Sequence, residues 1–159
     1  MIVSILLIVL VVVLDQVSKS LCMKFLAPVV TFPIIKDVLH LTYVENRGAA
    51  FGMLADKRWI FMVISTLGII ALFVWMAVSK PKSAWTKIGL SFVIGGGIGN
   101  MIDRVALGYV VDMIDCRFIN FYVFNVADSF VCIGCAMVII GLLTEVAEET
   151  RAKKEKESD

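Results

Sequence analysis

The chain has 159 residues, of which 60% are hydrophobic and 18% are charged, and its formal net charge is +1. The apolar excess excludes an ordinary water-soluble domain. The small net charge argues against a nucleic-acid partner, because binding nucleic acid requires a concentrated positive field. We therefore expect a membrane protein and, at this length, a single domain.

Long apolar stretches predict four transmembrane helices, since a bilayer span needs roughly 20 predominantly apolar residues. The first stretch lacks a basic leader and an A-x-A cleavage site, so we expect a retained span rather than a removed signal peptide. The third is the least apolar, because it contains Lys87 and a glycine cluster. The predicted spans are residues 2–21, 59–78, 84–102 and 126–146.

We expect residues 1–147 to form one four-helix transmembrane domain and residues 148–159 to form a separate charged tail. The tail, EETRAKKEKESD, mixes both charge signs and has no apolar face. This composition is typical of a solvated, disordered end.

Two segments outside the spans predict short strands. Residues 38–44, VLHLTYV, are rich in β-branched and aromatic side chains and are followed by the turn-prone NRG; residues 109–114 are a second candidate. Strands at the membrane surface must be paired, because hydrocarbon satisfies no backbone group. The predicted fold class is therefore an all-α membrane protein with four transmembrane helices and a small β-sheet at one surface.

Alternating the four spans across a bilayer brings the unusual polar residues to one side. A structural interpretation stays open for Asp15 and Lys19, which are spaced to pair within a helix, and for Asp103 and Arg104 as an interfacial ion pair. The other side holds several lysines and the tail. The clustered residues are Asp15, Lys19, Asn46, Arg47, Asn100, Asp103, Arg104, Asp112, Asn125 and Asp128.

Asp112 and Asp128 are the most informative members of this cluster. Asp112 lies in the apolar stretch YVVDMI, and Asp128 lies at the start of the last span. An ionisable side chain at the edge of a span is costly and marks a functional site. The alternative is that Asp112 is a surface-loop acid and Asp128 a helix N-cap. If the two carboxylates converge, they suggest acid–base chemistry.

Three other motifs favour structural roles. Gly95 and Gly99 have the small-xxx-small spacing of close helix packing, and no basic phosphate-binding ending follows them. Cys132 and Cys135 lie in an apolar helix without a second pair or a nearby histidine, so we expect packing residues rather than a metal or redox site. His40, the chain's one histidine, lies in a strand pattern, which favours a structural role over a serine-type triad.

Two rival functions of other classes fit parts of the pattern. A small proton- or cation-coupled transporter would also bury acids, but its polar groups would line the full depth of the bilayer rather than one side. A scaffold subunit would explain the glycines but not the clustered acids and asparagines.

Five blocks of the sequence, taken together and in this order, resemble lipoprotein signal peptidase, also called signal peptidase II. They are DQVSK at 15–19, ENRGAAFG at 45–52, GGGIGNMIDRV at 95–105, GYVVDMI at 108–114 and FNVADSFVCIG at 124–134. The length and the four spans agree with that family. One departure is Met113, where many relatives carry phenylalanine, and we expect it to alter packing beside Asp112 rather than chemistry.

The resemblance implies an intramembrane aspartic endopeptidase that removes the signal peptide of diacylglyceryl-modified bacterial prolipoproteins, cutting just before the lipidated cysteine. It assigns catalysis to Asp112 and Asp128, which share one proton and activate a water between them, and it implies no metal or other cofactor. We expect Phe51, Met53 and Ile102 to border the lipid tails. The supporting residues that it implies are Asp15, Lys19, Asn46, Gly48, Asn100, Asp103, Arg104, Asn125 and Ala127.

The orientation and assembly follow from the same resemblance. Lysine and arginine are nearly balanced between the two sides, so the cytoplasmic excess of basic residues does not settle the orientation. The resemblance implies a multi-pass protein of the bacterial cell membrane, with both termini in the cytoplasm and the active site at the outer leaflet. We expect a monomer whose partners are prolipoprotein substrates and membrane lipid.

Overall fold

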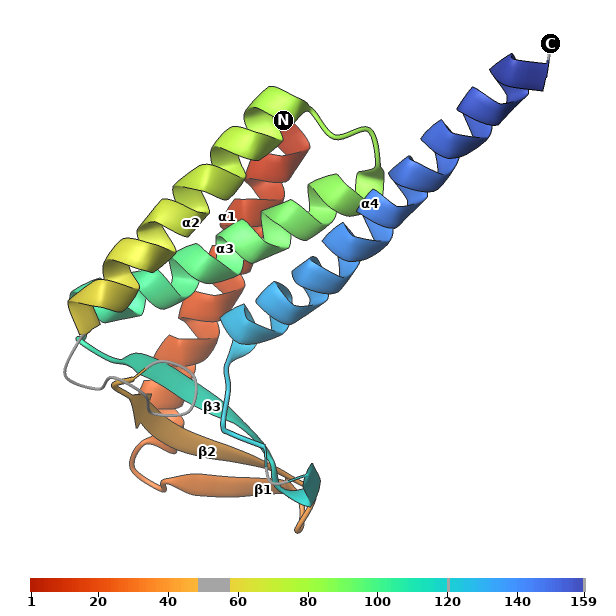
Figure 1. The fold of residues 1–159 in the computed structure, drawn as a ribbon. Helices are drawn as coiled ribbons and strands as arrows, with labels where there is room; N and C mark the ends of the chain where they lie inside the picture. Colours follow the sequence, from red (N-terminus) through yellow and green to blue (C-terminus); the bar gives the residue numbers. More distant parts are fainter. Residues whose placement is uncertain (49–57, 120, 159) are drawn as a thin grey trace.

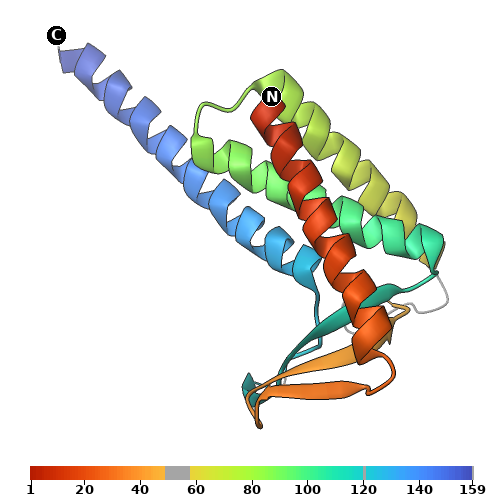
Figure 2. The ribbon, with the colours of Figure 1, turned by 180° about the vertical axis from the view of Figure 1, so that it is seen from behind.

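The computed structural model describes residues 1–48, 58–119 and 121–158 (Figure 1). Four long helices lie side by side, a small sheet lies at one end of them, and the N-terminus and the end of α4 lie towards the other (Figures 1 and 2). The helices and strands, in order, are α1 (Ile2–Leu21), η1 (Cys22–Leu26), β1 (Thr31–Ile35), β2 (Leu39–Asn46), α2 (Arg58–Ser79), α3 (Ala84–Ala106), β3 (Val110–Cys116), η4 (Arg117–Ile119) and α4 (Val126–Ser158).

The predicted spans coincide with the long helices, and three of these are apolar enough to cross a membrane. Within the described residues, the qualifying segments are Ile2–Leu26, Met62–Ser79 and Val126–Lys154. The third predicted span, residues 84–102, is helical as part of α3 but does not qualify by hydropathy. The reason is its position: α3 contacts α1, α2 and α4, and it buries small and polar residues such as Thr86, Ser91 and Gly96.

Glycines allow α3 to approach its neighbours closely. A Cβ added to Gly89 would lie 2.6 Å from the carbonyl oxygen of Gly134 on α4. A Cβ added to Gly95 would lie 2.8 Å from Cβ of Val11 on α1. The predicted packing role of the glycine cluster is therefore confirmed.

The paired cysteines of α4 do not pack in the bundle. Cys132 and Cys135 are exposed on the helix surface, so the expectation that they are packing residues is wrong. Gly134, which lies between them in the sequence, faces Gly89 of α3 instead.

The sheet is antiparallel, in the order β1-β2-β3. The two predicted strands are confirmed as β2 and β3, and the register places Val44 opposite Asp112 and Asn46 opposite Val110. Strand β1 was not predicted, since Pro33 interrupts its pattern. Proline is tolerated there because β1 is an edge strand.

The charged end of the chain is helical rather than disordered, because α4 continues to Ser158. Its alanine, glutamate, lysine and arginine residues are strong helix formers, and Glu149 precedes Lys153 by four residues, the favourable spacing for opposite charges. These preferences extend a helix that the apolar segment has already nucleated.

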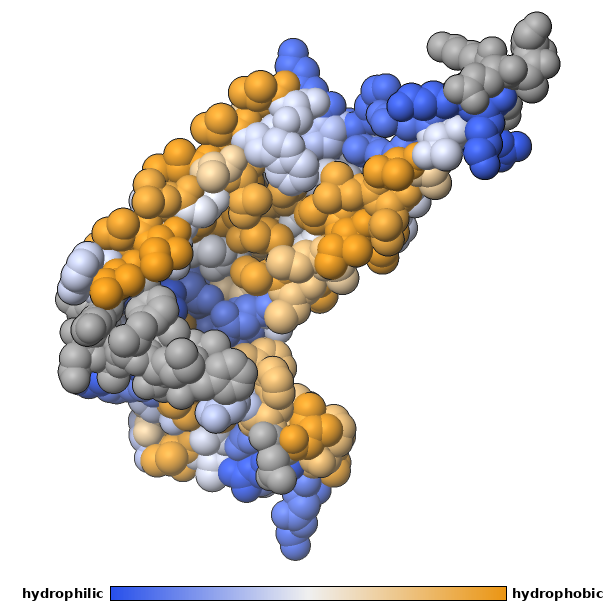
Figure 3. Space-filling model, viewed as in Figure 1, coloured by the Kyte–Doolittle hydropathy of each residue, from blue (hydrophilic) through white to orange (hydrophobic). Residues whose placement is uncertain are grey.

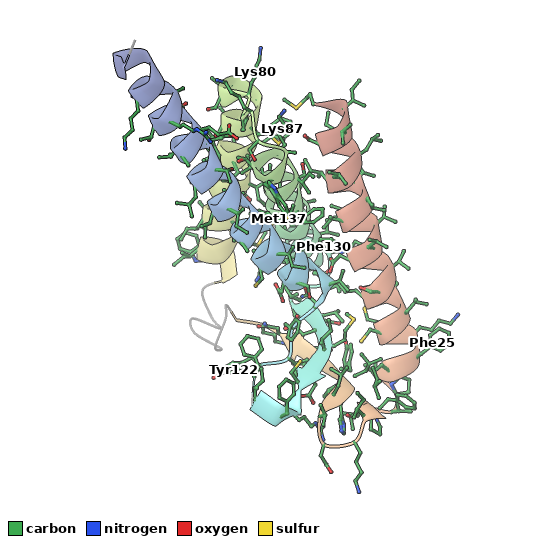
Figure 4. The ribbon with its side chains drawn as sticks, turned by 90° about the vertical axis from the view of Figure 1, so that its right-hand side faces the viewer. Phe25, Lys80, Lys87, Tyr122, Phe130 and Met137 are labelled. Atoms are coloured by element: carbon green, nitrogen blue, oxygen red, sulfur yellow. The ribbon has the colours of Figure 1, made fainter. Side chains whose placement is uncertain are left out.

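The surface has separate apolar and hydrophilic areas, as expected for a membrane protein. Apolar residues cover the helices, hydrophilic residues cover the far end of α4, and a second hydrophilic area lies in the hollow between the helices and the sheet (Figure 3). Lys80 and Lys87 lie at the end of the bundle remote from the sheet (Figure 4).

Replacing Gly89 with alanine tests the close packing of α3 on α4. The added methyl meets the Gly134 carbonyl oxygen and the Val138 nitrogen of the α4 backbone as well as a methyl of Val138, so we expect Gly89→Ala to destabilise the fold by about 1–3 kcal/mol. Gly68→Ala is the matched control, because a Cβ at Gly68 meets nothing within 4 Å. Thermal unfolding of both variants in one detergent measures the difference. Equal unfolding midpoints would contradict the packing described here.

Candidate functional site

A buried lysine joins α1 to α3 at the sheet end of the bundle. Lys19 has a side chain only 2% exposed, and its Nζ lies 2.8 Å from Asp15 Oδ2 and 3.0 Å from Asp103 Oδ2. It also donates to Asn100 Oδ1 at 2.9 Å. An ammonium has three N–H donors and no acceptor, so every donor of Lys19 has a partner.

The two acids paired with Lys19 also hold the elements of the site in place. Asp15 Oδ1 accepts a hydrogen bond from the backbone N–H of Ala127 at 3.0 Å, which fixes the first turn of α4. Asp103 Oδ2 accepts from the backbone N–H of Val111 at 3.0 Å, which fixes β3. One ion cluster therefore positions both segments that carry Asp112 and Asp128.

Gln16 is a member of this cluster that the sequence reasoning missed. Its Nε2 lies 2.9 Å from Asp103 Oδ1 and 3.1 Å from the carbonyl oxygen of Gly99. The available signal was a polar amide next to Asp15 in an otherwise apolar helix. Gly99 is also part of the arrangement, since a Cβ there would lie 2.5 Å from Asp15 Oδ2.

Asp128 and Asn125 cap the start of α4 reciprocally. The backbone N–H of Asp128 donates to Asn125 Oδ1 at 2.9 Å, and the backbone N–H of Asn125 donates to Asp128 Oδ2 at 3.2 Å. This is the geometry of a capping box. The structural interpretation of Asp128 is therefore correct in part: its carboxylate stabilises the helix start, although Asn125 is the capping residue.

Asp112 is held by two asparagines from other elements. Asn125 Nδ2 donates to Asp112 Oδ1 at 2.7 Å, and Asn46 Nδ2 donates to Asp112 Oδ2 at 3.0 Å. The backbone N–H of Gly48 donates to Asn46 Oδ1 at 3.1 Å. This bond turns the Asn46 amide so that its Nδ2 faces Asp112.

The orientation of Asn100 follows from Lys19. Because Lys19 only donates, the Asn100 atom beside it must be the oxygen, and Nδ2 then donates to Asp128 Oδ1 at 2.7 Å. Asn100 Oδ1 also accepts from Asn125 Nδ2 at 3.0 Å. The amides thus form a continuous chain between the Asp112 and Asp128 carboxylates.

Burial changes the acidity of Asp112 on β3. Asp112 is only 2% exposed. This burial is the main reason why its pKa is raised to about 6. The nearby charge of Asp128 acts in the same direction, and the hydrogen bond from Asn46 acts in the opposite one. Asp128 is only partly buried. Arg104, whose Nη1 lies 3.3 Å from the Asn100 carbonyl oxygen, interacts electrostatically with both carboxylates.

The structure brings most of the clustered residues into one site, from the ends of α1, α3 and α4 and from β2 and β3. Arg47 is the exception: it is exposed and pairs with Glu45 at 2.8 Å instead of contacting either carboxylate of the site. Ile102 is 37% exposed on α3, and Phe51 and Met53 lie outside the described residues. Met113 is buried against Cys22.

His40 lies apart from the site. It is buried in β2 opposite Asp115, with Nδ1 3.4 Å from Thr31 Oγ1. Within the described residues, no group of three or more His, Cys, Asp or Glu side chains is placed to hold a metal ion.

Comparison with known proteins gives the family. Residues 7–144 match the family described as signal peptidase (SPase) II. The chain belongs to the signal peptidase II family. The matched range includes every site residue described above and ends before the charged part of α4.

Individual relatives agree with this family. The chain is 50% identical over 133 residues to the lipoprotein signal peptidase of Caldanaerobacter subterraneus subsp. tengcongensis, covering 84% of this chain and 89% of the relative. It is 45% identical over 139 residues to that of Clostridioides difficile strain 630, covering 87% and 93%.

Solved structures agree as well. Two bacterial membrane enzymes superpose with TM-scores of 0.81 and 0.80 at 35% and 36% identity. The alignments cover 92% and 89% of this chain, and 90% and 92% of the solved chains. This member of the signal peptidase II family is therefore a multi-pass membrane protein.

Proposed function

We propose that this signal peptidase II is an aspartic endopeptidase that removes the signal peptide from diacylglyceryl-modified prolipoproteins by cleaving before the lipidated cysteine. The observation that carries the proposal is that Asn125 donates to both acids, from Nδ2 to Asp112 at 2.7 Å and from its backbone N–H to Asp128 at 3.2 Å. Two carboxylates held by one residue can act as a pair.

Asp112 and Asp128 have different roles in this proposal because their surroundings differ. Asp112 is buried, with a pKa raised to about 6, and it carries the proton of the pair. Asp128 lies at the positive N-terminal end of α4, where an anion is favoured, and it is the more accessible acid. Two neighbouring carboxylates do not both ionise cheaply, because their like charges repel.

Cleavage then follows from two proton transfers. Ionised Asp128 takes a proton from a water, whose oxygen attacks the scissile carbonyl carbon, while neutral Asp112 donates a hydrogen bond to the carbonyl oxygen. Collapse of the tetrahedral intermediate breaks the C–N bond, and the proton held by Asp128 passes to the leaving amine. The carboxylates supply every transfer, so this mechanism requires no metal or other cofactor.

The supporting residues act on the pair and on the substrate backbone. Asn46 and Asn100 hold one carboxylate each, and Arg104 balances their negative charge. Lys19 with Asp15 and Asp103 fixes the scaffold on which these groups depend, and Gly48 and Ala127 contribute backbone N–H donors. These assignments match the positions that the family resemblance implies.

We propose that residues 1–147 form the domain that lies in the cell membrane. In this proposal α3 also spans the bilayer, in addition to the three helices that are apolar enough by themselves. The supporting observation is that α3 is enclosed by the three apolar helices. With four spans, both termini lie on the side opposite the sheet, which we place in the cytoplasm, with the site at the outer leaflet and the charged end of α4 in the cytoplasm. We propose that a monomer is active, since all site groups come from one chain.

An impermeant thiol reagent tests this orientation in intact cells. In a chain lacking its own cysteines, a cysteine in place of Lys36 should be labelled from outside, and a cysteine added after residue 159 should not. Labelling of the added C-terminal cysteine alone would reverse the orientation.

The two-aspartate mechanism predicts that Asp112→Asn and Asp128→Asn each lose turnover by at least about 100-fold. Asparagine keeps the shape but can neither accept a proton from water nor hold the shared proton. Binding of a diacylated lipopeptide should stay near the wild-type value, because most affinity comes from burying apolar surface. Rate and affinity are measured in one detergent.

Asp37→Asn is the matched control for both variants. Asp37 lies between β1 and β2 with a positive φ of 60°, a conformation that asparagine also tolerates. This variant should keep full activity. If Asp112→Asn or Asp128→Asn turned over at a rate similar to that of Asp37→Asn, the mechanism would be wrong.

Asn46→Ala tests the role of Asp112 through the pH dependence of kcat/KM. Because neutral Asp112 is required, kcat/KM of the wild type should fall as the pH rises through about 6. Removing Asn46 deletes a hydrogen bond that favours the ionised form, which raises the pKa further. The fall should therefore move to higher pH, with a lower maximum rate. An unchanged or lower midpoint of this pH dependence would contradict the assignment of the proton to Asp112.

A further inference from the structure

A second hollow lies between the end of α1 and the sheet. It is a groove of about 480 Å³ whose lining, apart from Ser18, is entirely apolar. Leu21 and Phe25 border it from the helical side, and Val29 and Phe32 border it from the strand side. No step of the proposed cleavage uses it.

The groove lies on the opposite face of the catalytic strand from the site. Side chains alternate along a strand, and Asp112 of β3 faces Asn46 and Asn125. Met113, the next residue, lines the groove and packs against Cys22. A substrate whose scissile bond lies at Asp112 therefore cannot place its lipid in this groove without crossing the strand.

The groove opens beside the last residues of the first apolar segment. Leu21 and Phe25 are 52% and 62% exposed, and both belong to the apolar segment Ile2–Leu26, which is long enough to cross a bilayer. Phe25 points outward at the end of α1, on the side of the molecule opposite Tyr122 (Figure 4). In the membrane placement proposed above, the groove is therefore open to bilayer lipid.

A positive charge stands at the mouth of the groove. The Nζ of Lys24 lies 5.1 Å from the ring centroid of Phe25, and Lys24 is exposed on η1. An apolar slot next to an ammonium complements an acyl chain that carries a phosphate headgroup.

We propose that the groove binds one acyl chain of an anionic bilayer phospholipid, with the lipid phosphate at Lys24. The bound chain packs against Met113 and so supports β3 from behind Asp112. The occupant is a membrane lipid and not the diacylglyceryl group of the substrate.

The test uses the full chain in mild detergent with phosphatidylglycerol or phosphatidylcholine carrying a photoreactive acyl chain. Native mass spectrometry should show phosphatidylglycerol retained over phosphatidylcholine, and photocrosslinks should concentrate between residues 21 and 32. Lys24→Gln should lower phosphatidylglycerol retention roughly fivefold. Lys36→Gln, the same charge change in the turn between β1 and β2, should leave it unchanged.

Three results would overturn the proposal. Equal retention of the two lipids in the wild type would remove the phosphate contact at Lys24. Crosslinks spread evenly over the exposed faces of α2 and α4 would show no site at the groove. Displacement of phosphatidylglycerol by an equimolar diacylated lipopeptide would make the groove a substrate site. The readout is binding, so it is independent of whether Asp112 and Asp128 carry catalysis.

Discussion

The ion pairs of the buried Lys19 with Asp15 and Asp103 are the interactions on which the site depends. An ammonium buried in a membrane protein is strongly unfavourable unless its donors are satisfied and its charge is balanced. Asp15, Asp103 and Asn100 meet both requirements. Each of these partners then acts elsewhere: Asp15 holds the start of α4, Asp103 holds β3, and Asn100 directs its amide to Asp128.

The groups that stabilise the fold at this end are also the groups of the proposed chemistry. The carboxylate of Asp128 closes the capping box that starts α4, and it is also the proposed base. Asp112 receives no helix dipole, lies in a buried strand, and has the raised pKa. The different roles proposed for these two identical side chains therefore follow from their surroundings, because one lies in a buried strand and the other lies at the start of a helix.

The distribution of buried ionisable groups along the bundle suits a peptidase better than a transporter. The buried ionisable groups gather at the sheet end, and the hydrophilic surface there lies in a hollow between the helices and the sheet (Figure 3). A transmembrane path would need such groups through the depth of the bundle. The buried positions of α3 nearer its start carry no ionisable side chain; they are Thr86, Gly89, Leu90, Ser91 and Ile94.

The sequence predicted the helices well because apolar length is a local signal. It also brought the site residues to one end, because the parity of four spans needs no knowledge of packing. It did not predict that Lys19 pairs with Asp103, a contact between residues far apart in the chain, or that Gln16 joins them. Strand β1 was missed because its residues are exposed and include Pro33, and the helical end of α4 was missed because charge composition alone suggested disorder.

Infrared spectroscopy can show whether Asp112 holds the single proton of the carboxylate pair. The carbonyl band of a neutral carboxyl group should be present in the resting wild type at low pH and should disappear with a midpoint near pH 6. The same titrating band should be missing from Asp112→Asn and should remain, with a shifted midpoint, in Asn46→Ala. If Asp112→Asn kept a band with the wild-type midpoint, the proton would belong to another acid, and Asp112 would not be the protonated member of the pair.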